Sequence, residues 1–295
     1  MSIYMNPLTD FAFKKLFGEP SSKNILIDFL NTMLKENHQV ITDITIMNTE
    51  QLGITKDDRV AVFDLYCINE HGEQFVVEIQ RAQQVHFKDR TVCYSSFLIQ
   101  KQGRKGSEWN YELKPLYIIS LLDFIMDRTD IQSDKFYHKV KLLNVDSGEL
   151  FYEKLTFVYL ELPKFKKHVE QIHTHFEKWV YLFRNMESLQ TIPEPLNDRI
   201  FMELLEKAKL INLKDYELSE YETTLKRYRD NRNVIDSAKF FGYEDGKAEG
   251  KIEGKAEGKL ENKIEVAILS KKEGLPIPLI SKLTGLSEKE IEELK

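Results

Sequence analysis

The sequence predicts an α/β fold, in which a mixed sheet flanked by helices fills residues 1–162 and a helical C-terminal region follows. Along the first 124 residues, helical patterns are followed by three strand-like runs, another helical pattern and a further strand, an order typical of mixed α/β domains. The run PLYIISLLDF, residues 115–124, is almost uninterrupted in apolar residues, which indicates a strand buried on both faces. After Pro163 the apolar residues recur at helical spacing instead.

The N-terminal elements are expected to be two helices. Residues 6–10, with the sequence NPLTD, offer capping side chains before an apolar helix that contains Phe11, Phe13 and Leu16. A second apolar helix is expected over residues 22–35. Three strand-like runs follow, the last two joined by a tight turn at residues 69–72. These strands are expected over residues 40–47, 59–68 and 73–80.

The later elements follow from the same signals. A helix is expected over residues 85–101, ended by Gly103. After the buried strand at residues 116–124, two more strands are expected over residues 136–145 and 155–162. Residues 163–241 are predicted to form a helical extension, with helices over residues 166–185, 196–210 and 218–239.

The last 54 residues are predicted to be a linker and a small tail. In residues 242–262 a charged unit repeats as GKAE, GKIE, GKAE and GKLE. Because each glycine costs a helix about 1 kcal/mol relative to alanine, we interpret this segment as a solvated, partly helical linker or as the small-residue seam of a homodimer. Residues 263–295 are predicted to hold two short helices, with Ser287 capping the second against Glu290. This tail resembles a helix-turn-helix in outline, which leaves packing, self-association and DNA reading open.

Composition and charge restrict the class of protein. The 295 residues are 42% hydrophobic and 31% charged, as in folded globular proteins, and the net charge of −6 argues against a surface that binds polyanions everywhere. Two cysteines without CxxC spacing do not indicate a disulfide or zinc framework. The sequence contains no glycine-rich nucleotide-binding pattern, so we expect no organic cofactor. Without a leader-like start or an apolar run of roughly 18 to 20 residues, we expect a cytoplasmic protein with no membrane span.

One pair of carboxylates has the arrangement that metal chemistry needs. Asp64 lies in an apolar strand, where an ionised carboxylate is unfavourable unless it is paired or bound to a cation. Glu78 and Gln80 are two residues apart, so they share a face of the next strand. If the turn has four residues, Asp64 lies opposite residue 77, and a bulge or a five-residue turn places it opposite Glu78. The pair then converges on a hard cation, unless it is a surface pair or contacts Lys or Arg.

The order Asp64, then Glu78-Ile79-Gln80 after a short hairpin resembles the D…(D/E)xK signature, with glutamine where lysine is usual. The chain as a whole resembles the Rpn family of recombination-promoting nucleases and transposase-like proteins, in the PD-(D/E)xK nuclease superfamily. Besides Asp64, the matching segments are residues 10–18, residues 77–80, residues 115–124, and Asp89-Arg90 with Tyr94. The lysine- and glutamate-rich repeat and the TGLS-containing tail are also similar to this family.

This resemblance implies a restriction-endonuclease-like fold and a metal-dependent DNA endonuclease acting in recombination or transposition-like processes. It implies that Asp64, Glu78 and the carbonyl of Ile79 bind the metal, which is Mg²⁺, with Mn²⁺ or Ca²⁺ possible. Gln80 would orient a water, but a neutral amide cannot replace the charge of a lysine. The alternative is therefore a catalytically silent module that keeps the nuclease fold and binds nucleic acid or protein.

Other residues are candidates for support. Lys14 is favoured over Lys15 and Lys101 as the substitute cation, because it lies one turn after Asp10 on the same helix face. Asp10 is interpreted as a helix cap or as outer-sphere metal support. Further possible contacts to the DNA backbone, or braces of the sheet, are Arg90 and Tyr94, which share a helix face, and the basic loop residues Lys101, Arg104 and Lys105.

Overall fold

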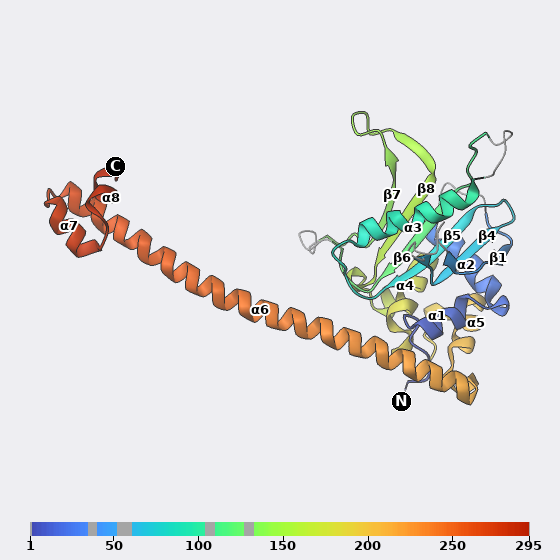
Figure 1. Ribbon diagram of the computed structural model, residues 1–295. Helices are drawn as coiled ribbons and strands as arrows, with labels where there is room; N and C mark the ends of the chain where they lie inside the picture. Colours follow the sequence, from blue (N-terminus) through green and yellow to red (C-terminus); the bar gives the residue numbers. More distant parts are fainter. Residues whose placement is uncertain (1, 35–39, 52–60, 104–109, 127–132, 295) are drawn as a thin grey trace. The chain divides into compact units, whose positions relative to one another are not determined.

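We describe the chain from a computed structural model, over residues 2–34, 40–51, 61–103, 110–126 and 133–294. The chain divides into two compact units, Met1–Arg232 and Asn233–Lys295. The first unit contains the sheet and the helices that cover it (Figure 1). No helix in the described part of the chain combines the length and apolarity that crossing a membrane requires.

The first unit begins with two buried helices, α1 (Asp10–Phe17) and α2 (Lys23–Met33), separated by the short 3₁₀ helix η1 (Pro20–Ser22). Thr9 caps α1, because its hydroxyl accepts a hydrogen bond from the backbone N–H of Ala12 at 3.3 Å. Thr9, and not Asp10, is therefore the N-terminal cap of this helix.

A six-stranded mixed sheet forms the centre of the unit, in the order β1-β4-β5-β6-β8-β7. Strands β5, β6 and β8 run parallel to one another, and the other pairs are antiparallel. Every residue of β5 and β6 is buried, as the apolar run at residues 115–124 predicts. The predicted α/β class is confirmed. The strands are β1 (Ile44–Ile46), β4 (Leu65–Asn69), β5 (Gln74–Gln80), β6 (Leu116–Leu122), β7 (Tyr137–Leu143) and β8 (Leu150–Glu161).

The strand predicted over residues 59–68 is interrupted. Its first part, β3 (Ala61–Val62), pairs with β2 (Glu50–Gln51) in a separate two-stranded sheet, and its second part is β4. Phe63 and Asp64 lie between them, outside both strands, while Arg59 and Val60 fall outside the described residues. The break releases Asp64 from the regular alternation of the sheet.

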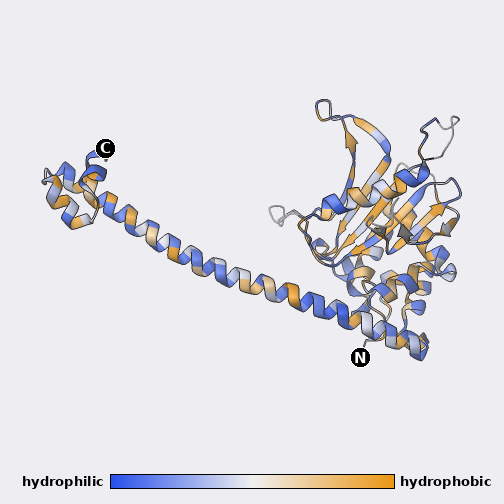
Figure 2. Ribbon diagram, viewed as in Figure 1, coloured by the Kyte–Doolittle hydropathy of each residue, from blue (hydrophilic) through white to orange (hydrophobic). Residues whose placement is uncertain are grey.

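Helices cover both faces of the sheet (Figure 1). Helix α3 (Phe87–Gln102) packs on the face to which Val76, Ile118 and Tyr159 point, and the predicted end at Gly103 is confirmed. Alternate residues, among them Val77 and Ile119, point to the other face. That face is covered by α1 and α2 and by the later helices α4 (His175–Asn185) and α5 (Arg199–Ala208). Figure 2 shows the apolar residues gathered in the strands.

The region after the sheet is helical, as predicted, but its boundaries differ. Short 3₁₀ helices, η3 (Leu162–Lys164) and η4 (Val169–Gln171), precede α4, which begins after the capping box of Thr174 and Glu177 and not at residue 166. Three further 3₁₀ helices are η5 (Met186–Ser188), η6 (Glu194–Leu196) and η7 (Leu210–Asn212). Helix α6 (Asp215–Lys272) is continuous over 58 residues and includes the whole GKxE repeat.

The second unit has a small core of its own. The end of α6 packs with α7 (Ile277–Thr284) and α8 (Glu288–Glu293) around Ala267, Ile280, Leu286 and Ile291. Gly285 ends α7 in the left-handed conformation, with φ of 72°, which glycine adopts without strain. Ser287 and Glu290 form the predicted capping box of α8.

Candidate metal centre

The interruption between β3 and β4 places Asp64 beside the end of strand β5. The hairpin pairs Leu65 with Val77 and Ile68 with Gln74. Five residues, 69–73, therefore lie between the paired Ile68 and Gln74, instead of four. The same register, continued by one position, brings Asp64 opposite Glu78, although Asp64 lies outside β4. The five-residue connection considered from the sequence is therefore the one that forms.

Reciprocal hydrogen bonds join Asp64 to β5. The backbone N–H of Ile79 donates to Asp64 Oδ2 at 2.7 Å, and the backbone N–H of Asp64 donates to Glu78 Oε1 at 3.2 Å. Because β4 begins only at Leu65, the Asp64 carboxylate accepts the hydrogen bond that a regular strand neighbour would otherwise accept. Each carboxylate is thus fixed by the backbone of the other segment.

Both carboxyl groups lie where ionisation is unfavourable. Burial raises the pKa of Asp64, opposed mainly by the hydrogen bond from Ile79. Glu78 is 7% exposed, and burial, together with the nearby charge of Asp64, raises its pKa to about 8. Two neighbouring acids whose ionisation is disfavoured are an arrangement that a divalent cation relieves.

The donor set fits a hard cation that keeps open positions. Within the described ranges, no group of three or more His, Cys, Asp or Glu side chains is placed to hold a metal ion. The oxygen atoms that the site offers are those of the two carboxylates and of nearby backbone carbonyls. The carbonyl of Gln80 accepts from Asp123 N–H on the β6 side at 2.9 Å. Since backbone groups alternate along a strand, the carbonyl of Ile79 points to the Asp64 side. Oxygen ligands with room for water and phosphate suit Mg²⁺ or Mn²⁺.

Gln80 and Arg90 extend the site toward α3. Gln80 Nε2 donates to Glu78 Oε2 at 3.1 Å, and the Arg90 guanidinium donates to Gln80 Oε1. The guanidinium lies 5.5 Å from the ring centroid of Tyr94. This side of the site also holds a small cavity of about 10 Å³, lined by Phe63, Val76, Glu78, Gln80, Arg90, Thr91, Tyr94, Ile118 and Ser120.

The α1 side contributes charges of both signs. Asp10 forms an ion pair with Arg81, which also donates to the carbonyl of Leu8 at 3.0 Å. Asp10, Arg81 and Lys14 all act electrostatically on Asp64, and Lys14 is exposed. Arg81 is not among the residues singled out from the sequence, although its position directly after Gln80 is an available signal.

The remaining predicted residues lie elsewhere or outside the described ranges. Lys15 is engaged by Glu19 at 3.0 Å and by Glu217 at 2.6 Å. Lys101 lies near the end of α3, 5.9 Å from the ring centroid of Tyr66. It is eleven residues from Arg90, which is about 16 Å along a helix. The predicted loop residues Arg104 and Lys105 are not among the described residues.

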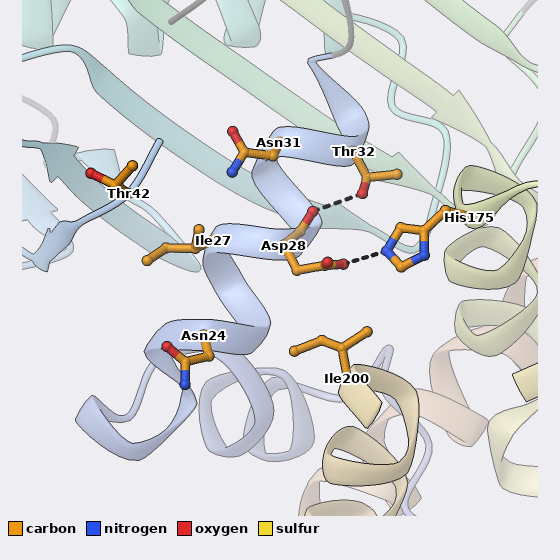
Figure 3. A pocket seen from close by; sticks show the side chains of 8 residues that line it. All are labelled: Asn24, Ile27, Asp28, Asn31, Thr32, Thr42, His175 and Ile200. Atoms are coloured by element: carbon orange, nitrogen blue, oxygen red, sulfur yellow. Dashed lines mark hydrogen bonds and ion pairs between the residues drawn. The ribbon is translucent and has the colours of Figure 1, made fainter. Parts of the chain in front are cut away.

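A larger pocket of about 420 Å³ is lined mainly by α2, with one residue each from α4 and α5 (Figure 3). None of the predicted site residues lines it. Its acid, Asp28, points toward His175 and accepts from His175 Nε2 at 2.7 Å and from Trp179 Nε1 at 2.8 Å. Asn31 is held by both backbone groups of Ile41. These polar groups join α2 to α4 and to the segment before β1.

The fold and the carboxylate pair define the class. A mixed sheet covered by helices, with two acids brought together beside a hairpin strand, is a nuclease-type α/β fold of the restriction-endonuclease-like class. A family model described as PD-(D/E)XK nuclease family transposase matches residues 7–238. The chain therefore belongs to this family, which confirms the family predicted from the residues. Searches of curated proteins and of solved structures found no match.

Proposed function

We propose that the chain is a metal-dependent DNA endonuclease of the PD-(D/E)xK type, acting in recombination or transposition-like processes. The observation that carries the proposal is the pair of hydrogen bonds by which Asp64 and β5 hold the Asp64 and Glu78 carboxylates in place. Both carboxyl groups lie in surroundings that raise their pKa values. The family, a nuclease family of transposases, supports DNA as the substrate.

Asp64, Glu78 and the carbonyl of Ile79 would hold Mg²⁺ or Mn²⁺. When bound, the ion would neutralise charge on the phosphodiester and make hydroxide accessible near neutral pH. The chain's own groups hold the two carboxylates in position, through the N–H groups of Ile79 and Asp64. Gln80 orients Glu78 and keeps a second amide hydrogen for a water. Lys14, exposed and within electrostatic reach of Asp64, is positioned to meet substrate phosphate.

The test is cleavage of supercoiled plasmid by the purified full chain with Mg²⁺, Mn²⁺ or EDTA. We expect nicking or linearisation that requires metal and falls by at least about 100-fold in Asp64→Asn and Glu78→Gln, since these substitutions remove the charges that hold the ion. Asp146→Asn, which replaces an exposed acid in the turn between β7 and β8, is the matched control and should leave cleavage unchanged. Full activity in both site variants would refute the assignment.

A catalytically silent module that binds nucleic acid or protein is the second candidate. It is favoured by one observation, the neutral Gln80 at the position where the superfamily has lysine. Calorimetry of the full chain with Mg²⁺ or Mn²⁺ separates the two candidates. Millimolar metal that neither binds nor alters DNA affinity would favour the silent module.

A further inference from the structure

Arg90 reaches the candidate metal centre from a different element than the metal ligands do. It lies on the first turns of α3, and its guanidinium donates to Gln80 Oε1 and, at 3.0 Å, to Gln84 Oε1. It is partly buried, against the ring of Tyr94. The contact to Gln80 faces into the site, while the aromatic contact holds the guanidinium in place.

The donors of Arg90 decide how Gln80 is oriented. A guanidinium has five N–H donors and no acceptor, so the group of Gln80 that faces Arg90 must be its oxygen. The amide nitrogen must then face Glu78, where it donates to Oε2 at 3.1 Å. An amide whose oxygen accepts from a cation is also a stronger donor, because hydrogen bonds in a chain polarise one another. Arg90, Gln80 and Glu78 thus form a directed chain of donors.

We propose that Arg90 supplies, from helix α3, the positive charge that the lysine of the D…(D/E)xK signature would supply, and that Gln80 transmits it to Glu78. The inference rests on the proposed nuclease function and assigns Arg90 as a positioning residue. Lys14, favoured from the sequence for this role, is exposed on α1 and acts electrostatically on Asp64. Lys101 lies at the other end of α3.

The first experiment compares Arg90→Met with Lys88→Met in the full chain. Lys88 is an exposed lysine two residues away on the same helix, so both variants lose one charge. We expect Arg90→Met to lower plasmid cleavage by on the order of 100-fold, the usual loss when a preorganised charge-stabilising donor is removed. Lys88→Met should cleave like the unaltered chain. Unchanged cleavage by Arg90→Met would overturn the proposal.

Metal binding without DNA distinguishes charge supply from simple bracing. Loss of a nearby cation lowers the repulsion of a divalent ion, so Mn²⁺ should bind Arg90→Met at least about threefold more tightly by calorimetry, although cleavage falls. A brace would give the opposite sign, because a loosened Glu78 binds metal more weakly, and that result would overturn the proposal. If the unaltered chain binds Mn²⁺ but does not cleave DNA, the proposed function fails. The change in Mn²⁺ affinity on Arg90→Met still tests the role of Arg90 in that case.

The decisive test is to move the charge. Gln80→Lys creates the Glu-x-Lys order of the signature and places an ammonium where the amide lies. In Arg90→Met it should restore cleavage to within about tenfold of the unaltered chain, since the site regains its preorganised positive charge. A double variant that melts like the unaltered chain and cleaves no better than Arg90→Met would overturn the proposal.

Discussion

Asp64 and Glu78 both lie where burial disfavours ionisation, and the charge of Asp64 makes ionisation of Glu78 still less favourable. Burial is the largest cause that raises both pKa values, and the hydrogen bonds that the backbone donates only partly offset it. The arrangement is unfavourable as two free carboxylates and favourable around a divalent cation. We therefore expect the stability of the fold to depend, through these two residues, on both pH and metal binding.

The stability of the metal-free protein should depend on pH through Glu78. Its pKa is raised to about 8 in the fold from an ordinary value of 4.5, so between these values the unfolded chain binds fewer protons than the folded one. The free energy of unfolding therefore falls as pH rises through this window. Denaturant unfolding in EDTA should show a larger loss between about pH 5 and about pH 8 for the unaltered chain than for Glu78→Gln.

The control for this dependence is Asp89→Asn, which replaces an exposed acid on α3. It should leave the pH dependence of unfolding as it is in the unaltered chain. Identical pH dependence for the unaltered chain and Glu78→Gln would contradict the raised pKa. Added Mg²⁺ should reverse the trend, since the metal binds the ionised pair and stabilises the folded state.

At this scale the sequence predicts which two carboxylates come together better than which residues surround them. Asp64 and Glu78 can be named because spacing and hairpin register depend on local sequence. The direction in which the Arg90 side chain points cannot be predicted, because a helical position allows a side chain to contact phosphate or the sheet equally well. The pairing of Arg81 with Asp10 joins residues 71 positions apart, and no local pattern contains such a contact.

Among the elements, the junction of α2 with α4 depends on one acid. Asp28 accepts from the indole N–H of Trp179, whose side chain is fully buried, and from His175. Trp179 also packs against Phe17 and Phe29. The acid therefore satisfies a donor in the middle of an aromatic cluster.

Removal of this acid should destabilise the first unit without affecting the metal centre. Asp28→Ala leaves the indole N–H of Trp179 buried and unpaired, which costs about 1–3 kcal/mol in the free energy of unfolding. Asp146→Ala, in the exposed turn between β7 and β8, should change it by less than about 0.5 kcal/mol. Chemical denaturation monitored by tryptophan fluorescence measures both. Equal stability of the two variants would contradict the structural importance of this hydrogen bond.

The elements also show where sequence patterns stop being informative. The break at Phe63 and Asp64 escapes sequence reasoning because residues 60–68 are apolar throughout except for Asp64. Only pairing with two different sheets separates β3 from β4. By contrast, the start of α4 is readable, since Thr174 and Glu177 have the capping-box spacing. A prediction that gives this cap more weight than the apolar spacing before Thr174 places the start of the helix correctly.

At the scale of the whole molecule, α6 is an unusual helix. From residue 236 to residue 263 every side chain is exposed, and a β-carbon added to any of the five glycines between residues 242 and 258 would meet no described atom within 4 Å. Helices in proteins gain most of their stability from packing, and each glycine costs about 1 kcal/mol relative to alanine. Nothing within the described part of the chain requires these glycines.

We expect this segment to self-associate, through a second copy of the chain. Sedimentation of the full chain should give a dimer, and a chain that ends at Asp245, without the repeat and the tail, should be a monomer. The reason is that packing of α6 against its copy would supply the contacts that the single helix lacks. Monomers in both cases would refute the prediction. Dimers in both would place the interface in the first 245 residues.

The two hydrogen bonds that join residue 64 to β5 would also determine the entropy of binding a metal ion at this site. A free glutamate side chain loses roughly 1.5–2 kcal/mol of rotamer freedom when it is fixed. Here Glu78 and Asp64 are already held by the backbone, so that loss accompanies folding of the chain and not arrival of the ion. A cation would meet a receptor whose ligands need no ordering, and the loss of its own hydration shell becomes the main barrier to its entry.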